Sequence, residues 1–231
     1  MSKNNNKNLK KISYKIILIG NSQVGKTTFF KKLTKKIYSE RNISTIGIEK
    51  TTFTKIISVP EDPFDSSSPE EEIEFSIEFF DTAGQERYRA ITSSYFKNAQ
   101  GLLLFYDITN KKSFEDHEIW INAVIENLGE KTSNSKKSYS LLLIGNKIDL
   151  EDQRQVTKEE AIEICEKMNI GWGGEISIKD LSFEELEEKF SEMVKHIYKD
   201  IGNQESNQMV TKKLAGGEKK KKKNNNNQLC C

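Results

Sequence analysis

One eight-residue stretch near the amino terminus constrains this chain more than any other. It reads G-x-x-x-x-G-K-T from Gly20 to Thr27 and directly follows an apolar run that ends at Ile19. We expect a buried strand, a glycine-bounded turn and a helix that opens at Lys26, a geometry that directs backbone N–H groups and the positive helix end toward one point. A phosphate chain fits there, with Lys26 reaching the β- and γ-phosphates and the Thr27 hydroxyl binding Mg²⁺. A chance glycine-containing turn is the alternative, which the flanking strand and helix disfavour.

The charge is distributed unevenly along the 231 residues, whose net charge is +1. Residues 1–15 carry five lysines and no acid, and residues 211–231 carry seven lysines and one glutamate, so the body between them is acidic. This argues against a core that binds nucleic acid and favours basic ends that seek an anionic surface. No apolar run approaches the roughly 18 residues of a membrane-spanning helix. The three cysteines form no disulfide framework, which favours a reducing, cytosolic setting.

Predicted strands alternate with predicted helices, so we expect an α/β fold with a mostly parallel sheet between helices. Ligands bind at the carboxyl ends of the strands in such sheets, and each candidate site residue comes just after a strand. Ser182 and Glu185 form a predicted capping box at the start of the last helix. The expected strands are 14–19, 48–59, 73–80, 102–106, 141–144 and a weak one at 172–177, and the expected helices are 26–36, 86–97, 114–127, 158–168 and 182–199.

Three segments fall outside this alternation. Residues 1–12 are rich in Asn and Lys and predict a disordered basic extension. Residues 60–72 hold all three prolines of the chain among acids and serines, which predicts an exposed insertion. Residues 201–231 are expected to form a flexible tail, which leaves 13–200 as the folded domain.

A second motif follows the strand predicted at 73–80. Asp81 ends that strand and meets the requirement for a second Mg²⁺ contact, direct or through water. Gly84 allows close backbone approach to a phosphate, and Gln85 is a candidate for holding an attacking water. Asp-x-x-Gly alone is more often a turn than a site. Its place after a strand and beyond a phosphate-binding loop favours the site here.

A third motif, Asn146-Lys147-Ile148-Asp149, follows the strand predicted at 141–144. Asp149 can accept hydrogen bonds from the N1–H and the 2-amino group of guanine, which adenine does not offer. A buried carboxylate without those donors is costly, so the residue discriminates strongly between bases. A solvated turn is the alternative, since Asn and Asp are turn formers.

Together the motifs resemble the Ras superfamily of small GTPases and, within it, the Rab family, over about residues 13–200 and the carboxyl terminus. The residues that carry the resemblance are 20–27, 44–47, 80–88, 106–109, 146–149, 175–179 and 230–231. The resemblance implies a P-loop NTPase G domain, with a six-stranded, mostly parallel sheet and helices on both faces. The GTP-binding residues are expected to be Gly20, Asn21, Ser22, Gln23, Val24, Gly25, Lys26, Thr27, Thr28, Tyr38, Thr45, Gly84, Asn146, Lys147, Asp149, Ser177, Ile178 and Lys179.

The resemblance also implies roles for these residues. Tyr38 would flank the guanine, residues 177–179 would lie along the edge of the base, and Thr45 would bind Mg²⁺ and the γ-phosphate. In the mechanism we expect, Thr27 and Asp81 hold Mg²⁺, and loss of the γ-phosphate releases the loops around Thr45 and Gly84. No arginine has the spacing of a built-in finger, so hydrolysis of GTP to GDP should be slow until a partner contributes charge.

A Rab-like GTPase acts as a switch in vesicle trafficking. The expected partners are an exchange factor, a GTPase-activating protein, effectors and prenyl-binding escort or dissociation-inhibitor proteins. Several positions depart from the family pattern and indicate an altered effector surface: Glu49-Lys50 stands where Asp-Phe is usual, Phe80 replaces Trp, and Ile178 replaces a small Ala.

The chain ends in Cys230 and Cys231 behind a lysine run at 219–223. The pair has no partner ligands for zinc and resembles the doubly geranylgeranylated tail of Rab proteins, in which two lipid chains and a basic patch give stable anchoring. We expect the protein at the cytosolic face of an intracellular or plasma membrane, with a soluble cytosolic pool. Cys165 lies in a helical pattern and is expected to be a buried small hydrophobe.

Two other classes of protein stay open from the sequence. A P-loop kinase would need a lid over an acceptor substrate, and the motif at 146–149 argues against adenine. A membrane-tethered scaffold locked in one nucleotide state is compatible with Ile178 and the altered switch surface; it would bind GTP with little turnover.

Overall fold

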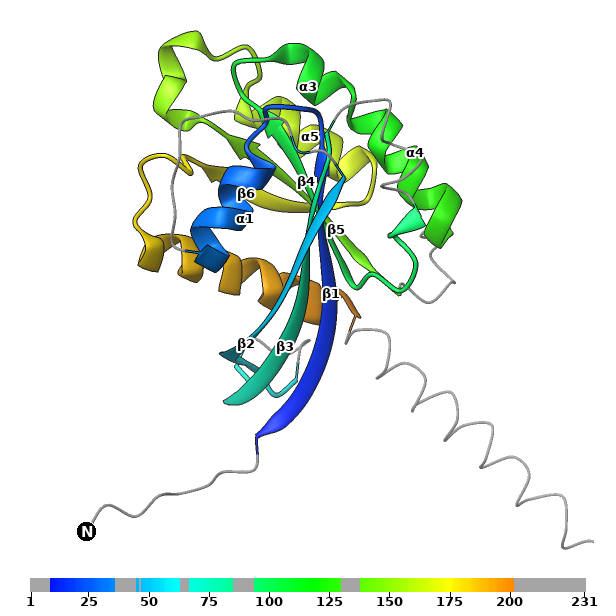
Figure 1. Ribbon diagram of the computed structural model, residues 1–231, viewed down its shortest axis with the longest axis vertical. Helices are drawn as coiled ribbons and strands as arrows, with labels where there is room; N and C mark the ends of the chain where they lie inside the picture. The colour runs from blue at the N-terminus through cyan, green and yellow to red at the C-terminus, as the bar shows by residue number, and fades with distance from the viewer. Residues whose placement is uncertain are drawn as a thin grey trace, which may run out of the picture.

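The computed structural model describes residues 9–35, 45, 47–62, 67–84, 94–129 and 138–201. Its centre is a six-stranded sheet in the order β2-β3-β1-β4-β5-β6 (Figure 1). The pairing of β2 with β3 is antiparallel and the other four pairings are parallel. The strands are β1 (Lys10–Gly20), β2 (Ile48–Pro60), β3 (Glu70–Thr82), β4 (Gly101–Asp107), β5 (Ser140–Asn146) and β6 (Gly171–Ile176).

Helices cover both faces of this sheet. Helix α1 and the helix formed by residues 183–201 pack on one face, where Phe29 and Phe190 lie in a shared core. Helices α4 and α5 pack on the other face, through Trp120 and Cys165. Every residue of β4 and β5 is buried because both faces of these strands are covered. The predicted fold class is confirmed. The helices are α1 (Lys26–Lys35), α3 (Lys111–Glu115), α4 (His117–Leu128) and α5 (Lys158–Lys167), with a 3₁₀ helix η2 (Ile148–Gln153).

The sheet is longer at one end than the sequence predicted. Strand β1 begins at Lys10, so residues 10–12 belong to the sheet and not to a disordered extension. They pair with residues 73–75 of β3. Part of the predicted insertion at 60–72 is also strand, because Pro60 pairs with Glu70 across the β2–β3 hairpin. Pro60 is tolerated there because it lies at the end of an edge strand, where a missing N–H costs little.

Two predicted helices differ from the structure. The helix expected at 114–127 is divided at Asp116 into α3 and α4. Helix α3 begins earlier than predicted, because Asn110 caps it by accepting a hydrogen bond from the Ser113 N–H. Residues 95–97, expected to end a helix, form a turn, and the rest of that helix, up to residue 93, lies outside the described residues.

Two local predictions are confirmed. The Ser182 N–H donates to Glu185 Oε2 at 2.7 Å, and the Glu185 N–H donates to Ser182 Oγ at 3.1 Å, which is the expected capping box. Cys165 is buried in the core, as expected for a small hydrophobe.

Candidate functional site

The phosphate-binding loop joins β1 to α1 and needs glycine at both of its ends. Gly20 and Gly25 have φ angles of +127° and +107°, in the left-handed range that favours glycine. A Cβ on Gly20 would lie 2.3 Å from the Phe105 carbonyl oxygen, and one on Gly25 would lie 2.2 Å from Asn146 Nδ2. The loop therefore fits tightly against β4 and against the third motif, and α1 opens at Lys26 as predicted.

The ammonium group of Lys26 is buried inside this loop. Its Nζ donates to the carbonyl oxygens of Gly20 at 2.8 Å and Asn21 at 2.7 Å. Burial lowers the pKa of Lys26 to about 8, although the nearby negative charge of Asp81 acts in the opposite direction. Among the described residues the hydrogen-bond acceptors of this buried ammonium group are carbonyl oxygens, and an anionic group placed at the loop would stabilise its charge.

Three oxygen-bearing side chains meet beside Lys26. The Thr27 hydroxyl oxygen lies 2.6 Å from Asp81 Oδ2 and 2.6 Å from the Thr45 hydroxyl oxygen. Asp81 is fully buried, and its Oδ1 has no hydrogen-bond partner among the described residues. Burial raises the pKa of Asp81, against the hydrogen bond from Thr27. Hydroxyl and carboxylate oxygens are the ligands that Mg²⁺ prefers, so this donor set and its unpaired oxygen fit that ion.

The second motif lies against the phosphate-binding loop. A Cβ on Gly84 would lie 2.4 Å from the Asn21 carbonyl oxygen and 2.4 Å from Lys26 Nζ, so a larger residue would displace the lysine. Gln85, which follows, lies outside the described residues, and so does Tyr38.

The third motif is bonded to both neighbouring loops. Asn146 Nδ2 donates to the Val24 carbonyl oxygen at 2.9 Å, while its Oδ1 accepts from the Ile178 N–H at 3.2 Å. Asp149 Oδ1 accepts from the Ser177 hydroxyl at 2.9 Å. Lys147 has a left-handed backbone (φ 74°), and its Nζ lies 2.5 Å from Asp107. The carboxyl ends of β1, β5 and β6 are thus joined at one edge of the sheet.

The remaining predicted residues surround this centre. Ser22 and Thr28 are half-buried, whereas Gln23 and Lys179 are exposed. Ile178, where Ala is usual, has its side chain buried in the core that contains Phe29. The substitution therefore leaves the backbone N–H of Ile178 free to donate to Asn146.

Sequence reasoning missed Lys32, which supports the site, and it missed the contacts of Asn21 with α4, although Asn21 itself was predicted to bind GTP. Lys32 of α1 is buried, and its Nζ donates to the carbonyl oxygens of Ile178, at 2.7 Å, and of Leu181. Asn21 donates to Asp116 Oδ2 at 2.7 Å and accepts from Trp120 Nε1 at 2.9 Å, which ties the phosphate-binding loop to α4. Lys32 has no sequence signal, since Lys31-Lys32 is typical of a solvated helix face, and the phosphate-binding motif that contains Asn21 does not indicate its partners on α4.

The sheet, the phosphate-binding loop, the oxygen cluster and the Asn-Lys-x-Asp motif together define a small GTPase fold. The Ras family model matches residues 15–199. Ras-related protein RABA4b of Arabidopsis thaliana is 34% identical over 188 residues, which cover 81% of this chain and 74% of that protein. Ras-related protein Rab-13 of Canis lupus familiaris is 34% identical over 193 residues, 84% of each chain. Ras-related protein Rab-11A of Dictyostelium discoideum is 35% identical over 185 residues, 80% of this chain and 76% of that protein.

The chain belongs to the Ras family and is a small GTPase of the Rab type. It binds GTP and GDP with Mg²⁺, hydrolyses GTP, and acts as a molecular switch in membrane trafficking. The scaffold alternative has no support from the family relationship. Family membership implies exchange factors, activating proteins, effectors and a dissociation inhibitor as partners in general. Rab proteins generally attach to membranes by a lipid anchor, and no helix in the described part of this chain is long and apolar enough to cross a bilayer.

Proposed function

We propose that the edge of the sheet formed by residues 20–28, 81–84, 146–149 and 177–179 is the nucleotide site of this GTPase. The convergence of Thr27, Asp81 and Thr45 beside the buried ammonium of Lys26 carries the proposal. Lys26 would neutralise the β- and γ-phosphates, and the three oxygen-bearing side chains would hold Mg²⁺, which screens the charge of those phosphates.

The switch would operate through Thr45. Its hydroxyl contacts Thr27, so Thr45 lies within reach of the same metal and of the γ-phosphate. Without the γ-phosphate, Thr45 would have no phosphate to bind, and the segment around it would be released. Gln85 would orient the attacking water. The only arginine among the described residues is Arg154, which is engaged in ion pairs, so the described part of the chain offers no arginine finger. An activating protein would supply that charge.

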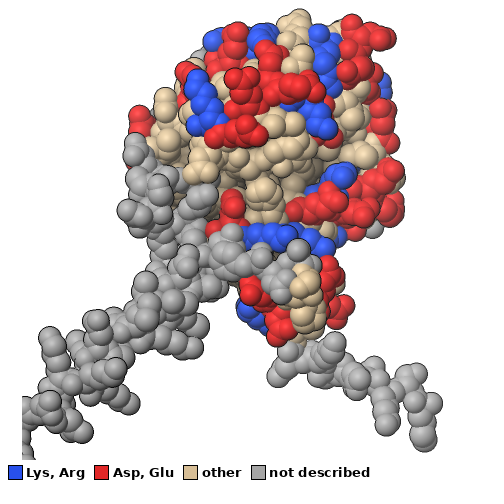
Figure 2. All heavy atoms as spheres, turned by 180° about the vertical axis from the view of Figure 1, so that it is seen from behind, with Lys and Arg blue, Asp and Glu red and all other residues tan. Residues whose placement is uncertain are grey.

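The tail would place the switch on a membrane. On the face of the molecule seen in Figure 2, acidic side chains are interspersed with Lys and Arg, and the described part of that face forms no continuous basic patch for an anionic bilayer or nucleic acid. We infer that Cys230 and Cys231 carry isoprenoid chains and that the lysines at 219–223 add attraction to an anionic surface. The protein would then occupy the cytosolic face of an intracellular or plasma membrane, with a soluble pool held by a prenyl-binding escort or dissociation inhibitor.

Substitution of Asp149 tests the site. The variant Asp149→Asn should weaken GTP binding severely, since the amide cannot accept from both guanine donors. Xanthine carries an oxygen where guanine has its 2-amino group, so the asparagine amide can donate to it and restore pairing. Binding of GTP and of xanthosine triphosphate would be measured side by side. Parent-like GTP affinity with no gain for the xanthine nucleotide would refute the proposed role of Asp149.

A further inference from the structure

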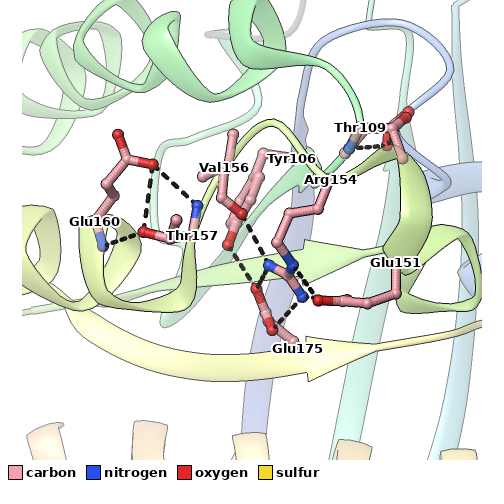
Figure 3. A network of polar contacts seen from close by, with 9 residues as sticks. Tyr106, Thr109, Glu151, Arg154, Val156, Thr157, Glu160 and Glu175 are labelled. Atoms are coloured by element: carbon pink, nitrogen blue, oxygen red, sulfur yellow. Dashed lines mark hydrogen bonds and ion pairs between the residues drawn. The ribbon is translucent and has the colours of Figure 1, made fainter.

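One arginine near the base motif has its full hydrogen-bonding capacity satisfied. Arg154 directly follows η2, the 3₁₀ helix that contains Asp149. Its Nη1 and Nη2 donate to the two carboxylate oxygens of Glu175 at 2.7 Å and 3.0 Å, and its Nε and Nη2 donate to the two oxygens of Glu151, both at 2.7 Å. Nη1 also donates to the Val156 carbonyl oxygen at 2.8 Å (Figure 3). A guanidinium group has five N–H donors, and all five are used.

An irregularity in β6 brings Glu175 to this position. The pairing of β6 with β5 steps from Trp172 opposite Leu143 to Glu175 opposite Gly145, which leaves one extra residue in β6. Gly174 within this bulge has a φ of +93°. Because side chains alternate between the faces of a strand, an extra residue turns the following side chain to the other face. The two glycines of the bulge thus direct Glu175 toward Arg154.

The two acidic partners of Arg154 differ in their surroundings. The side chain of Glu175 is 11% exposed, whereas that of Glu151 is 63% exposed. Burial, followed by the charge of Glu175, raises the pKa of Tyr106, so its hydroxyl stays protonated and donates to Glu175 at 3.4 Å. Exposed ion pairs contribute little, whereas removal of one partner of a buried pair leaves an uncompensated charge. The Arg154–Glu175 pair is therefore the one that constrains the structure.

This pair connects the two segments that are proposed to contact the base. Arg154 lies in the segment that carries Asp149, and Glu175 lies two residues before Ser177, whose hydroxyl donates to Asp149. We propose that Arg154 and Glu175 are positioning residues that hold the Asp149 carboxylate in register with the 177–179 segment, and thereby set discrimination for the 2-amino group of guanine. The inference rests on the proposed role of Asp149 in base recognition.

The test compares nucleotides that differ only at that amino group. Inosine diphosphate lacks the 2-amino group, so the ratio of its dissociation rate to that of GDP reports the contact with Asp149. In Arg154→Gln and Glu175→Gln we expect GDP to dissociate about tenfold faster, within the range for residues coupled in one ion-pair network. Dissociation of inosine diphosphate should be accelerated less, so the ratio of its dissociation rate to that of GDP should fall. A purely structural loss would accelerate both nucleotides equally.

Further variants identify the pair that matters. Arg154→Lys keeps the charge but loses the bidentate hydrogen bonds, so we expect a ratio of dissociation rates between those of the parent and Arg154→Gln. If Arg154→Gln does not fold, Arg154→Lys replaces it in the test. Glu151→Gln should change the ratio less than twofold, because its ion pair is exposed. Lys11→Gln is the matched control. It removes an ion pair with Glu74 at the start of β1, the end of the strand opposite to the phosphate-binding loop.

The outcomes distinguish the positioning role of Arg154 and Glu175 from the proposed role of Asp149 in base recognition. A parent-like ratio in both Arg154→Gln and Glu175→Gln, with the ratio lost in Asp149→Asn, would overturn the positioning role and leave base recognition by Asp149 intact. A parent-like ratio in Asp149→Asn would overturn the role of Asp149 itself, and the positioning inference with it.

Discussion

The Thr27 hydroxyl donates a 2.6 Å hydrogen bond to Asp81 Oδ2 across 54 positions of sequence. The other carboxylate oxygen of Asp81 is buried and unpartnered among the described residues. Burial alone disfavours the charged form of Asp81, and an oxygen-ligated cation placed beside it would stabilise that form. This arrangement makes Asp81 the most sensitive point of the proposed Mg²⁺ site.

We therefore expect Asp81→Asn to raise the Mg²⁺ concentration needed to retain GTP by about 10- to 100-fold, the range for polar groups that support a metal site. The amide keeps the size of the side chain but not its charge. Mg²⁺ titrations of GTP retention would measure the effect. Glu78→Gln, which removes a partly exposed carboxylate on the same strand, is the control. An unchanged Mg²⁺ dependence in Asp81→Asn would remove this residue from the metal site.

Hydrolysis provides a separate test. Gln85→Leu should leave nucleotide affinity nearly unchanged and lower the partner-stimulated rate by about 100-fold, because positioning of the water contributes most there. Single-turnover hydrolysis with and without an activating protein would show it. If the stimulated rate of the variant equals that of the parent, Gln85 has no part in the mechanism.

The buried thiol of Cys165 predicts both reactivity and a pH dependence. Burial raises the pKa of Cys165 to about 12 from its ordinary value of 9.0. Below pH 9 the thiol is neutral in folded and unfolded chains. Above pH 9 the unfolded chain loses a proton that the folded chain keeps, so this contribution to stability declines as the pH rises from 9 toward 12.

In protein without lipid, iodoacetamide at pH 8 should modify Cys230 and Cys231 but leave Cys165 unmodified until the chain is unfolded. Peptide mass analysis would locate the label. Thermal unfolding of Cys165→Ala should show a smaller loss of stability between pH 9 and 10.5 than the parent does. Rapid labelling of Cys165 in the folded protein would contradict its buried state.

The start of β1 predicts a sharp boundary for truncation. Removal of residues 1–8 should change the free energy of unfolding by less than about 0.5 kcal/mol, as for surface changes. Removal of residues 1–12 should cost about 2 kcal/mol, because it deletes ladder hydrogen bonds to β3 and the contact of Ile12 with the core. Urea unfolding of the two truncated proteins would decide, and equal stabilities would contradict the role of residues 10–12.

The membrane anchor is tested at the chain end. With Cys230 and Cys231 both replaced by Ser, the protein should become cytosolic with at most weak, salt-sensitive membrane association, since each buried CH₂ contributes about 0.8 kcal/mol. Neutralising the lysines at 219–223 should alter the strength or choice of membrane without abolishing attachment. Fractionation and mass analysis of the C-terminal peptide would measure both. Membrane retention of the double Ser variant would exclude the lipid anchor.

The sequence by itself determined the parts of this protein that depend on neighbours along the chain. The phosphate-binding loop, its strand and its helix are encoded within residues 14–35, because glycine placement and apolar runs act locally. The same holds for the capping box of Ser182 and Glu185 and for the fully buried strands β4 and β5. These local signals also carried the family resemblance.

Only the tertiary structure decided which distant groups meet. The extra strand residues at 10–12 form because the β2–β3 hairpin is long enough to pair with them. Asn146 reaches Val24 across 122 positions, and Lys32 reaches Ile178 across 146. Arg154 meets Glu175 only through a bulge whose register no local pattern reveals. Contacts of this kind depend on strand order and register, which are set by packing of the whole sheet and not by any segment alone.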